Sequence, residues 1–66
     1  MTVAKIIEIS SLSKKSFEDA IAKGVKRASE TVAGLQSAWV QDMEVGVNKG
    51  KVTEYRVKLK VTFVLK

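Results

Sequence analysis

Trp39, the single tryptophan of the 66-residue sequence, has the clearest potential for ligand chemistry. It lies in a strand-like segment in which Gln41 is the next residue on the same face, because side chains alternate between the two faces of a strand. An indole ring beside hydrogen-bond donors can stack on a planar aromatic ligand. The alternative is that Trp39 packs in a core or a contact between subunits, where aromatic residues are also common.

The composition excludes several kinds of site. The sequence contains no cysteine and no histidine, so disulfides, thiolate chemistry, imidazole catalysis and the usual zinc sites are ruled out. Without these residues or a glycine-rich phosphate loop, we expect a binding protein and not an enzyme. Asp42 and Glu44 share one strand face, but two carboxylates fall short of the six to eight oxygens that calcium prefers. We therefore predict no metal site and assign them a solvated or ion-paired role.

The last third of the sequence predicts the sheet that would position Trp39. Residues 38–47 and 52–65 have the character of two strands, and residues 48–51 (Asn-Lys-Gly-Lys) suit a hairpin loop. Odd positions from 55 to 65 are all apolar, whereas the even positions from 54 to 62 are charged or polar. One face of this strand should cover a helix, and the other should be basic.

A hairpin in which Val47 pairs with Val52 predicts the neighbours of Trp39. In that register, Trp39 lies opposite Lys60, Gln41 opposite Lys58 and Met43 opposite Arg56. All six residues would share the face directed away from the helix. A slip of one residue would invert this result.

The first half of the sequence predicts a strand and a helix. Residues 3–10 are rich in β-branched side chains, and Ser13 is a suitable N-cap for a helix over residues 14–33. Gly34 suits a left-handed C′ position, and Gly24 within the helix indicates close packing against another backbone. The predicted fold is α+β: a single βαββ domain over residues 1–66, with a three-stranded antiparallel sheet wrapped around one helix.

Size and charge narrow the range of partners. A domain this small has a thin core, which favours self-association into a homo-oligomer. The net charge of +5 could attract nucleic acid, anionic lipid or a phosphorylated small molecule, or could simply maintain solubility. Binding to a single strand usually requires several aromatic residues that stack on successive bases, and this chain offers one, so we do not expect a nucleic-acid partner. The absence of a signal peptide and of a membrane-length apolar run predicts a soluble cytoplasmic protein with no membrane partner.

The sequence also resembles a known family, the dodecins. The resemblance rests on the βαββ order, Trp39 shortly after the helix, and three stretches: Ser-Phe-Glu-Asp-Ala-Ile at 16–21, Ala-Ser-Glu-Thr-Val at 28–32, and Glu-Tyr-Arg-Val-Lys-Leu-Lys-Val-Thr-Phe-Val-Leu at 54–65. It extends over nearly the whole chain. Dodecins are small flavin-binding proteins that assemble into hollow dodecamers, and the resemblance implies the same for this chain.

The resemblance implies roles for individual residues. Trp39 would stack on the isoalloxazine ring of FMN, riboflavin or FAD, with two symmetry-related tryptophans enclosing a pair of flavins. Arg56 follows Tyr55 at the position where flavin-binding members carry a glutamine, and a guanidinium can donate hydrogen bonds but not accept them. With Gln41 and Lys58, these residues form the predicted flavin site of a storage or sequestration protein. The alternative is a dodecin-like oligomer that binds flavin weakly and takes calcium or coenzyme A instead.

Overall fold

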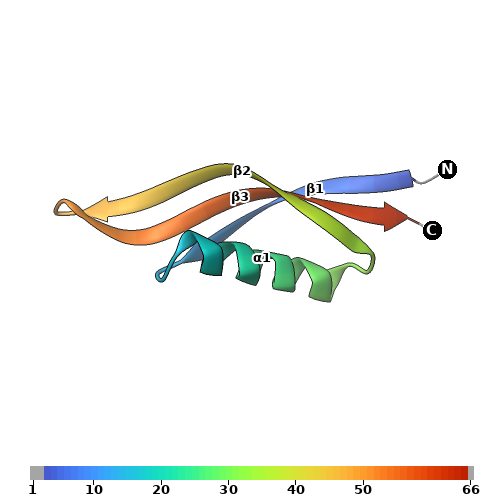
Figure 1. Ribbon diagram of the computed structural model, residues 1–66, viewed down its shortest axis with the longest axis horizontal. Helices are drawn as coiled ribbons and strands as arrows, with labels where there is room; N and C mark the ends of the chain where they lie inside the picture. Colours follow the sequence, from blue (N-terminus) through green and yellow to red (C-terminus); the bar gives the residue numbers. More distant parts are fainter. Residues whose placement is uncertain (1–2, 66) are drawn as a thin grey trace.

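The computed structural model describes residues 3–65 and confirms the predicted α+β fold. The elements are β1 (Val3–Ser13), α1 (Phe17–Thr31), β2 (Leu35–Asn48) and β3 (Lys51–Leu65). They form an antiparallel sheet in the order β1-β3-β2, with α1 packed across one face (Figure 1). The last strand of the chain is therefore the central strand of the sheet.

The alternation of apolar and charged residues explains why β3 occupies the centre. Val57, Leu59, Val61 and Phe63 point toward α1 and are almost completely buried. They form the core with Ala20 and Ala28 of the helix. These four alternate residues occupy the middle of β3, where α1 covers the apolar face of the strand.

The helix begins three residues later than the sequence predicted, and Ser13 is not its N-cap. β1 stays paired with β3 as far as Ser13, opposite Tyr55, so the chain cannot enter a helix at residue 14. Ser16 is the N-cap, and its Oγ accepts a hydrogen bond from the Asp19 amide at 3.0 Å. Ser13 is instead buried in the turn, where its Oγ accepts from the Lys15 amide at 2.9 Å and donates to Asp19 Oδ2 at 2.6 Å.

The helix ends at Thr31, because Val32 is extended with φ −132°. Gly34 has φ +85° and confirms the predicted left-handed glycine, although it lies one position beyond C′. A Cβ at Gly34 would lie 2.8 Å from the carbonyl oxygen of Val64, so both conformation and space require glycine here. At Gly24 the close neighbours are side chains of the sheet, Ser11 Cβ at 3.0 Å and Leu59 Cδ1 at 3.2 Å, and not another backbone.

The helix covers only the middle of the sheet. The 15 residues of β3 extend over about 50 Å, whereas the 15 residues of α1 extend over about 22 Å. The described chain accordingly measures 51 × 19 × 13 Å. The closed end of the β2–β3 hairpin projects beyond the start of α1 (Figure 1). We call this projecting end, residues 43–55, the arm. Within residues 3–65, no helix has the length and apolar character needed to cross a membrane.

Candidate ligand-binding face

Trp39 lies on the face of the sheet directed away from α1, which we call the outer face. Its side chain is 68% exposed, and the residue pairs with Lys60 of β3 as the sequence predicted. The ring borders a concavity of about 420 Å³ that is lined by Ile6, Glu8, Trp39, Lys60 and Thr62. Aromatic, aliphatic, hydroxyl and charged groups therefore meet at one exposed depression.

β1 supplies two of these residues, and the sequence did not identify either of them. Ile6 pairs with Thr62 and Glu8 pairs with Lys60, so both lie on the outer face beside the Trp39 row. Their type alone marks them as ordinary strand residues. The even spacing of Ile6 and Glu8 is the only signal in the sequence, and it becomes informative once β1 is known to pair with β3.

A β-bulge at Gln41 changes the register that the sequence predicted beyond Trp39. Val40 pairs with Leu59 but Asp42 pairs with Lys58, so Gln41 is the additional residue and is half-buried. The predicted pair of Gln41 with Lys58 is therefore wrong.

The predicted pair of Met43 with Arg56 is wrong for the same reason. Glu44 pairs with Arg56, and Met43 pairs with Val57. One extra residue moves every following side chain of β2 to the opposite face, so Asp42 and Glu44 point outward and Met43 points to the helix side.

The outer face is not the basic surface that the sequence predicted. Between positions 54 and 62 of β3, each cation has an acidic residue at its paired position: Lys60 has Glu8, Lys58 has Asp42, and Arg56 has Glu44. Glu54 adds a fourth carboxylate next to Arg56. The pattern of β3 alone indicated positive charge, but its two partner strands offset that charge.

Arg56 is held by two of these carboxylates. Its Nη1 donates to Glu44 Oε1 and its Nη2 donates to Glu54 Oε2, both at 3.2 Å. The arginine side chain is 49% exposed, so these ion pairs add little to stability. Their effect is to orient the guanidinium along the outer face.

Arg56 and Trp39 border two separate concavities within one chain. The second concavity, of about 300 Å³, is lined by Ser10, Asp42, Met43, Glu44, Arg56 and Lys58. Arg56 and Lys60 are four residues apart on β3, which corresponds to about 13 Å along the strand. Two of the predicted flavin-site residues, Arg56 and Lys58, thus line the same concavity. Trp39 borders the other concavity, and Gln41 lies at the bulge in β2.

The carboxylates do not gather into a metal site within one chain. No group of three or more acidic residues among residues 3–65 lies close enough together to hold a metal ion. A calcium ion would need further oxygen ligands, from water or from a second chain.

A three-stranded sheet wrapped around one helix, with a tryptophan exposed on its outer face, defines a small α+β protein with a candidate stacking site. The Dodecin family model matches residues 3–66. The chain therefore belongs to the dodecin family.

Individual relatives support this assignment. The calcium dodecin of Mycobacterium tuberculosis is 39% identical over 67 residues, which cover 100% of this chain and 93% of that protein. A crystal structure of a dodecin point mutant from Thermus thermophilus matches with a TM-score of 0.92 at 30% identity, covering 100% of this chain and 98% of that chain. The crystal structure of the M. tuberculosis calcium dodecin, a calcium-chelating antigen, matches with a TM-score of 0.83 at 37% identity, covering 97% and 91% of the two chains.

Proposed function

We propose that this protein binds and stores flavin in the cytoplasm, with the isoalloxazine ring stacked on Trp39 in a hollow homo-oligomer. The observation that carries the proposal is the exposed indole at a concave site in a member of the dodecin family. Trp39 and Ile6 place exposed apolar surface together at this concavity, a combination typical of a ligand site, and a planar ring offers the largest contact area with an indole.

The residues around Trp39 fit a flavin ring. Ile6 provides an aliphatic contact beside the indole, while Lys60 and Thr62 can donate hydrogen bonds to carbonyl oxygens of the ring. Arg56 cannot accept a hydrogen bond from a ring N–H, but the Glu8 carboxylate in the Trp39 concavity can. Glu8 would therefore supply the acceptor that the arginine lacks.

The second ring face of a flavin stacked on Trp39 would remain open in a single chain. In the dodecin arrangement, a second flavin and a second tryptophan related by two-fold symmetry cover it. This arrangement would shield the indole rings and the isoalloxazine rings from water. The indoles would also quench the fluorescence of the excited flavins. Storage with limited photodamage, and not catalysis, is the proposed outcome.

The charges favour a flavin with an uncharged tail. Four carboxylates lie on the outer face, and the two nearest to Arg56 already occupy its guanidinium. A phosphate placed along this face would meet negative charge at several positions. We therefore propose that riboflavin binds more tightly than FMN or FAD. The phosphates of coenzyme A would meet the same carboxylates, and binding of coenzyme A stays a prediction.

Fluorescence titration tests the proposed function. Adding the purified protein to micromolar riboflavin should quench the flavin emission, and Trp39→Ala should abolish the quenching. Ala38→Ser, which alters the neighbouring exposed position without removing the indole, is the matched control and should quench like the unmodified protein. Unchanged emission with the unmodified protein at saturating concentration would rule the proposal out.

Calcium binding is a second candidate, favoured by the 39% identity to a calcium dodecin. The described residues of one chain do not form a calcium site, so this candidate requires Asp42, Glu44 or other carboxylates from two copies of the chain. Isothermal titration with calcium chloride tests it. Binding that is lost in Asp42→Asn would support calcium, and heat equal to that of buffer would exclude it.

A further inference from the structure

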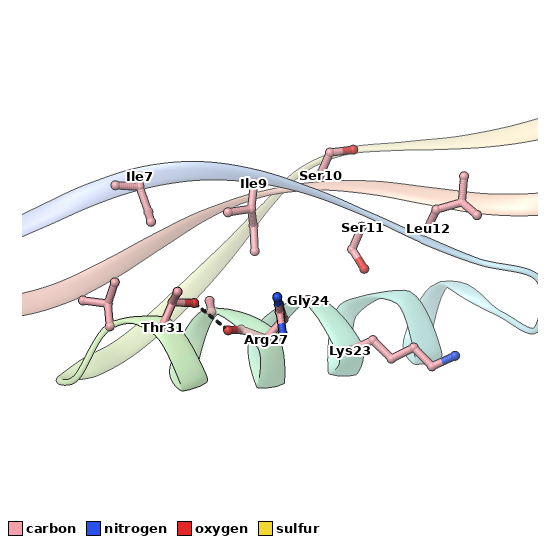
Figure 2. A pocket seen from close by; sticks show the side chains of 11 residues that line it. Ile7, Ile9, Ser10, Ser11, Leu12, Lys23, Gly24, Arg27 and Thr31 are labelled. Carbon is pink, nitrogen blue, oxygen red and sulfur yellow. Dashed lines mark hydrogen bonds between the residues drawn. The ribbon is translucent and has the colours of Figure 1, made fainter.

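The alternation of side chains along β1 places Glu8 on the outer face. Figure 2 shows Ile7 and Ile9 pointing from β1 toward α1, whereas Ser10 points away from the helix. Because side chains alternate along a strand, Glu8, which lies between the two isoleucines, also points away from α1. Its pairing with Lys60, a residue of the outer face, agrees with this orientation. The exposed Glu8 carboxylate therefore belongs to the concavity beside the indole.

The two charged groups of this concavity are available to a ligand. Among residues 3–65, the Glu8 carboxylate and the Lys60 ammonium group form no ion pair and no side-chain hydrogen bond. Glu44 and Glu54, by contrast, are both occupied by Arg56. An exposed pair between Glu8 and Lys60 would be worth little, so a bound molecule can replace it.

Glu8, Lys60 and Trp39 form one row across the three strands. Lys60 pairs with Glu8 on one side and with Trp39 on the other, so the cation lies between the carboxylate and the indole. Neighbouring strands are about 4.8 Å apart, so the row extends over about 10 Å. A planar ligand of two fused rings that stacks on Trp39 can therefore present one polar edge to both charged groups. Ile6, which is 61% exposed, adds an aliphatic contact beside the row.

The charges of this row select the hydrogen-bonding edge of the ligand. A carboxylate offers acceptors alone, and its two oxygens can accept from two adjacent N–H groups, whereas an ammonium group offers donors alone. The edge that satisfies both carries a carbonyl oxygen, a ring N–H and an exocyclic amino group in that order. Guanine presents this edge for base pairing, and a pterin presents the same one. A flavin offers the carboxylate a single N–H between two carbonyl oxygens, and adenine offers a ring acceptor beside its amino group.

We propose that the Trp39 concavity also binds a fused ring with a 2-amino-4-oxopyrimidine edge, that of guanine or a pterin. The ring stacks on the indole, Glu8 accepts from the ring N–H and the amino group, and Lys60 donates to the carbonyl oxygen. The ligand carries no phosphate, because the four carboxylates of the outer face disfavour one. This inference uses the concavity of the proposed function but does not depend on flavin binding.

Guanosine and inosine form a matched pair of ligands, because inosine differs only in lacking the 2-amino group. Equilibrium dialysis gives both affinities, and the emission of Trp39, the single tryptophan, reports stacking on the indole. The unmodified protein should bind guanosine at least about tenfold more tightly than inosine, since inosine lacks one hydrogen bond to a charged acceptor. Trp39→Ala should abolish the binding of both nucleosides. Equal affinity of the unmodified protein for the two would overturn the proposal.

Glu8→Gln tests whether the carboxylate makes this discrimination. Glutamine at the exposed position has nearly the same shape but offers one acceptor oxygen, so guanosine should lose its advantage over inosine. Glu44→Gln is the matched control, because it makes the same change on the outer face, in the arm and outside the Trp39 concavity. It should keep the tenfold ratio, and circular dichroism checks that both variants are folded. An unchanged ratio in Glu8→Gln, or the same loss in both variants, would refute the role of Glu8.

Neopterin distinguishes the two sources of the ring and completes the test. It carries the same edge on a pteridine, so its binding should depend on Glu8 and Trp39 in the same way, and the tighter of guanosine and neopterin identifies the source. If neither binds while riboflavin emission is quenched, this inference fails and the flavin proposal stands. If one of them binds through Glu8 and riboflavin emission is unchanged, the flavin proposal fails and this inference stands.

Discussion

Arg56 donates a hydrogen bond to Glu44 across the β2–β3 ladder, with 3.2 Å between Nη1 and Oε1. Glu44 can reach the arginine only because the bulge at Gln41 turns it to the outer face. The second amino group of Arg56 is occupied by Glu54. An arginine that would otherwise be available to an anionic ligand is thus engaged with its own chain.

Releasing Arg56 should change the preference among flavins. In Glu44→Gln/Glu54→Gln, the guanidinium is free to bind a phosphate and two negative charges are lost, so the affinity for FMN should rise about tenfold relative to riboflavin. Fluorescence titrations with both flavins provide the ratio. Glu30→Gln, on the exposed side of α1, removes a charge far from the outer face and should leave the ratio unchanged. Parallel changes for the two flavins in the double variant would contradict the prediction.

Replacing Arg56 with glutamine tests whether the two concavities serve one ligand. Glutamine both donates and accepts hydrogen bonds, so Arg56→Gln should strengthen riboflavin quenching about threefold to tenfold if the ligand on Trp39, or on the tryptophan of a second copy, reaches this position. Arg56→Met keeps a long side chain without hydrogen-bonding groups and serves as the control. The same affinity for both variants would show that position 56 lies outside the ligand site.

The turn before α1 should contribute a pH-dependent part to stability. Hydrogen bonding from Ser13 and then from Lys23 lowers the pKa of Asp19 below its ordinary value of 3.8. Because the folded pKa is the lower one, this stabilisation is fully present above the unfolded pKa of 3.8 and is lost as the pH falls through the folded value. Carboxyl NMR titration should show the pKa of Asp19 moving toward 3.8 in Ser13→Ala.

A matched variant separates the stabilisation that depends on the ionised Asp19 carboxylate from the stabilisation by the other hydrogen bonds of the turn. Ser16→Ala removes the N-cap bond to the Asp19 amide but does not remove a bond to its carboxylate. The loss of unfolding free energy in Ser13→Ala should shrink in acid, whereas the loss in Ser16→Ala should stay constant across the same pH range. Urea denaturation at pH 7 and at acidic pH measures both, and a constant loss in Ser13→Ala would refute the assignment.

Gly34 should be far less tolerant of substitution than Gly50. Both have positive φ, at +85° and +77°, but a Cβ at Gly34 would meet the Val64 carbonyl at 2.8 Å, while nothing lies within 4 Å of one at Gly50. Gly50→Ala should cost about 1 kcal/mol from conformation alone, and Gly34→Ala about 3 kcal/mol because a clash is added. Chemical denaturation measures the two losses. Equal losses would mean that the Val64 carbonyl moves aside without cost.

The sequence by itself determined those features of this protein that depend on the periodic spacing of apolar residues within one element or one hairpin. The two-residue alternation of β3 predicted the buried row Val57, Leu59, Val61 and Phe63, which packs against Ala20 and Ala28 of the helix. The hairpin pattern also placed Trp39 opposite Lys60. These predictions succeeded because each relies on neighbours along the chain or on the adjacent strand of one hairpin.

Only the tertiary structure decided the charge and shape of the outer face. The order β1-β3-β2 brings Glu8 to Lys60, a pairing between residues 52 positions apart that no local pattern specifies. The single extra residue at Gln41 turns Asp42 and Glu44 outward, and it converts a face that appeared basic into one with alternating charges. Strand period assigns side chains to faces, but the pairing of distant strands and the position of a bulge determine which faces meet.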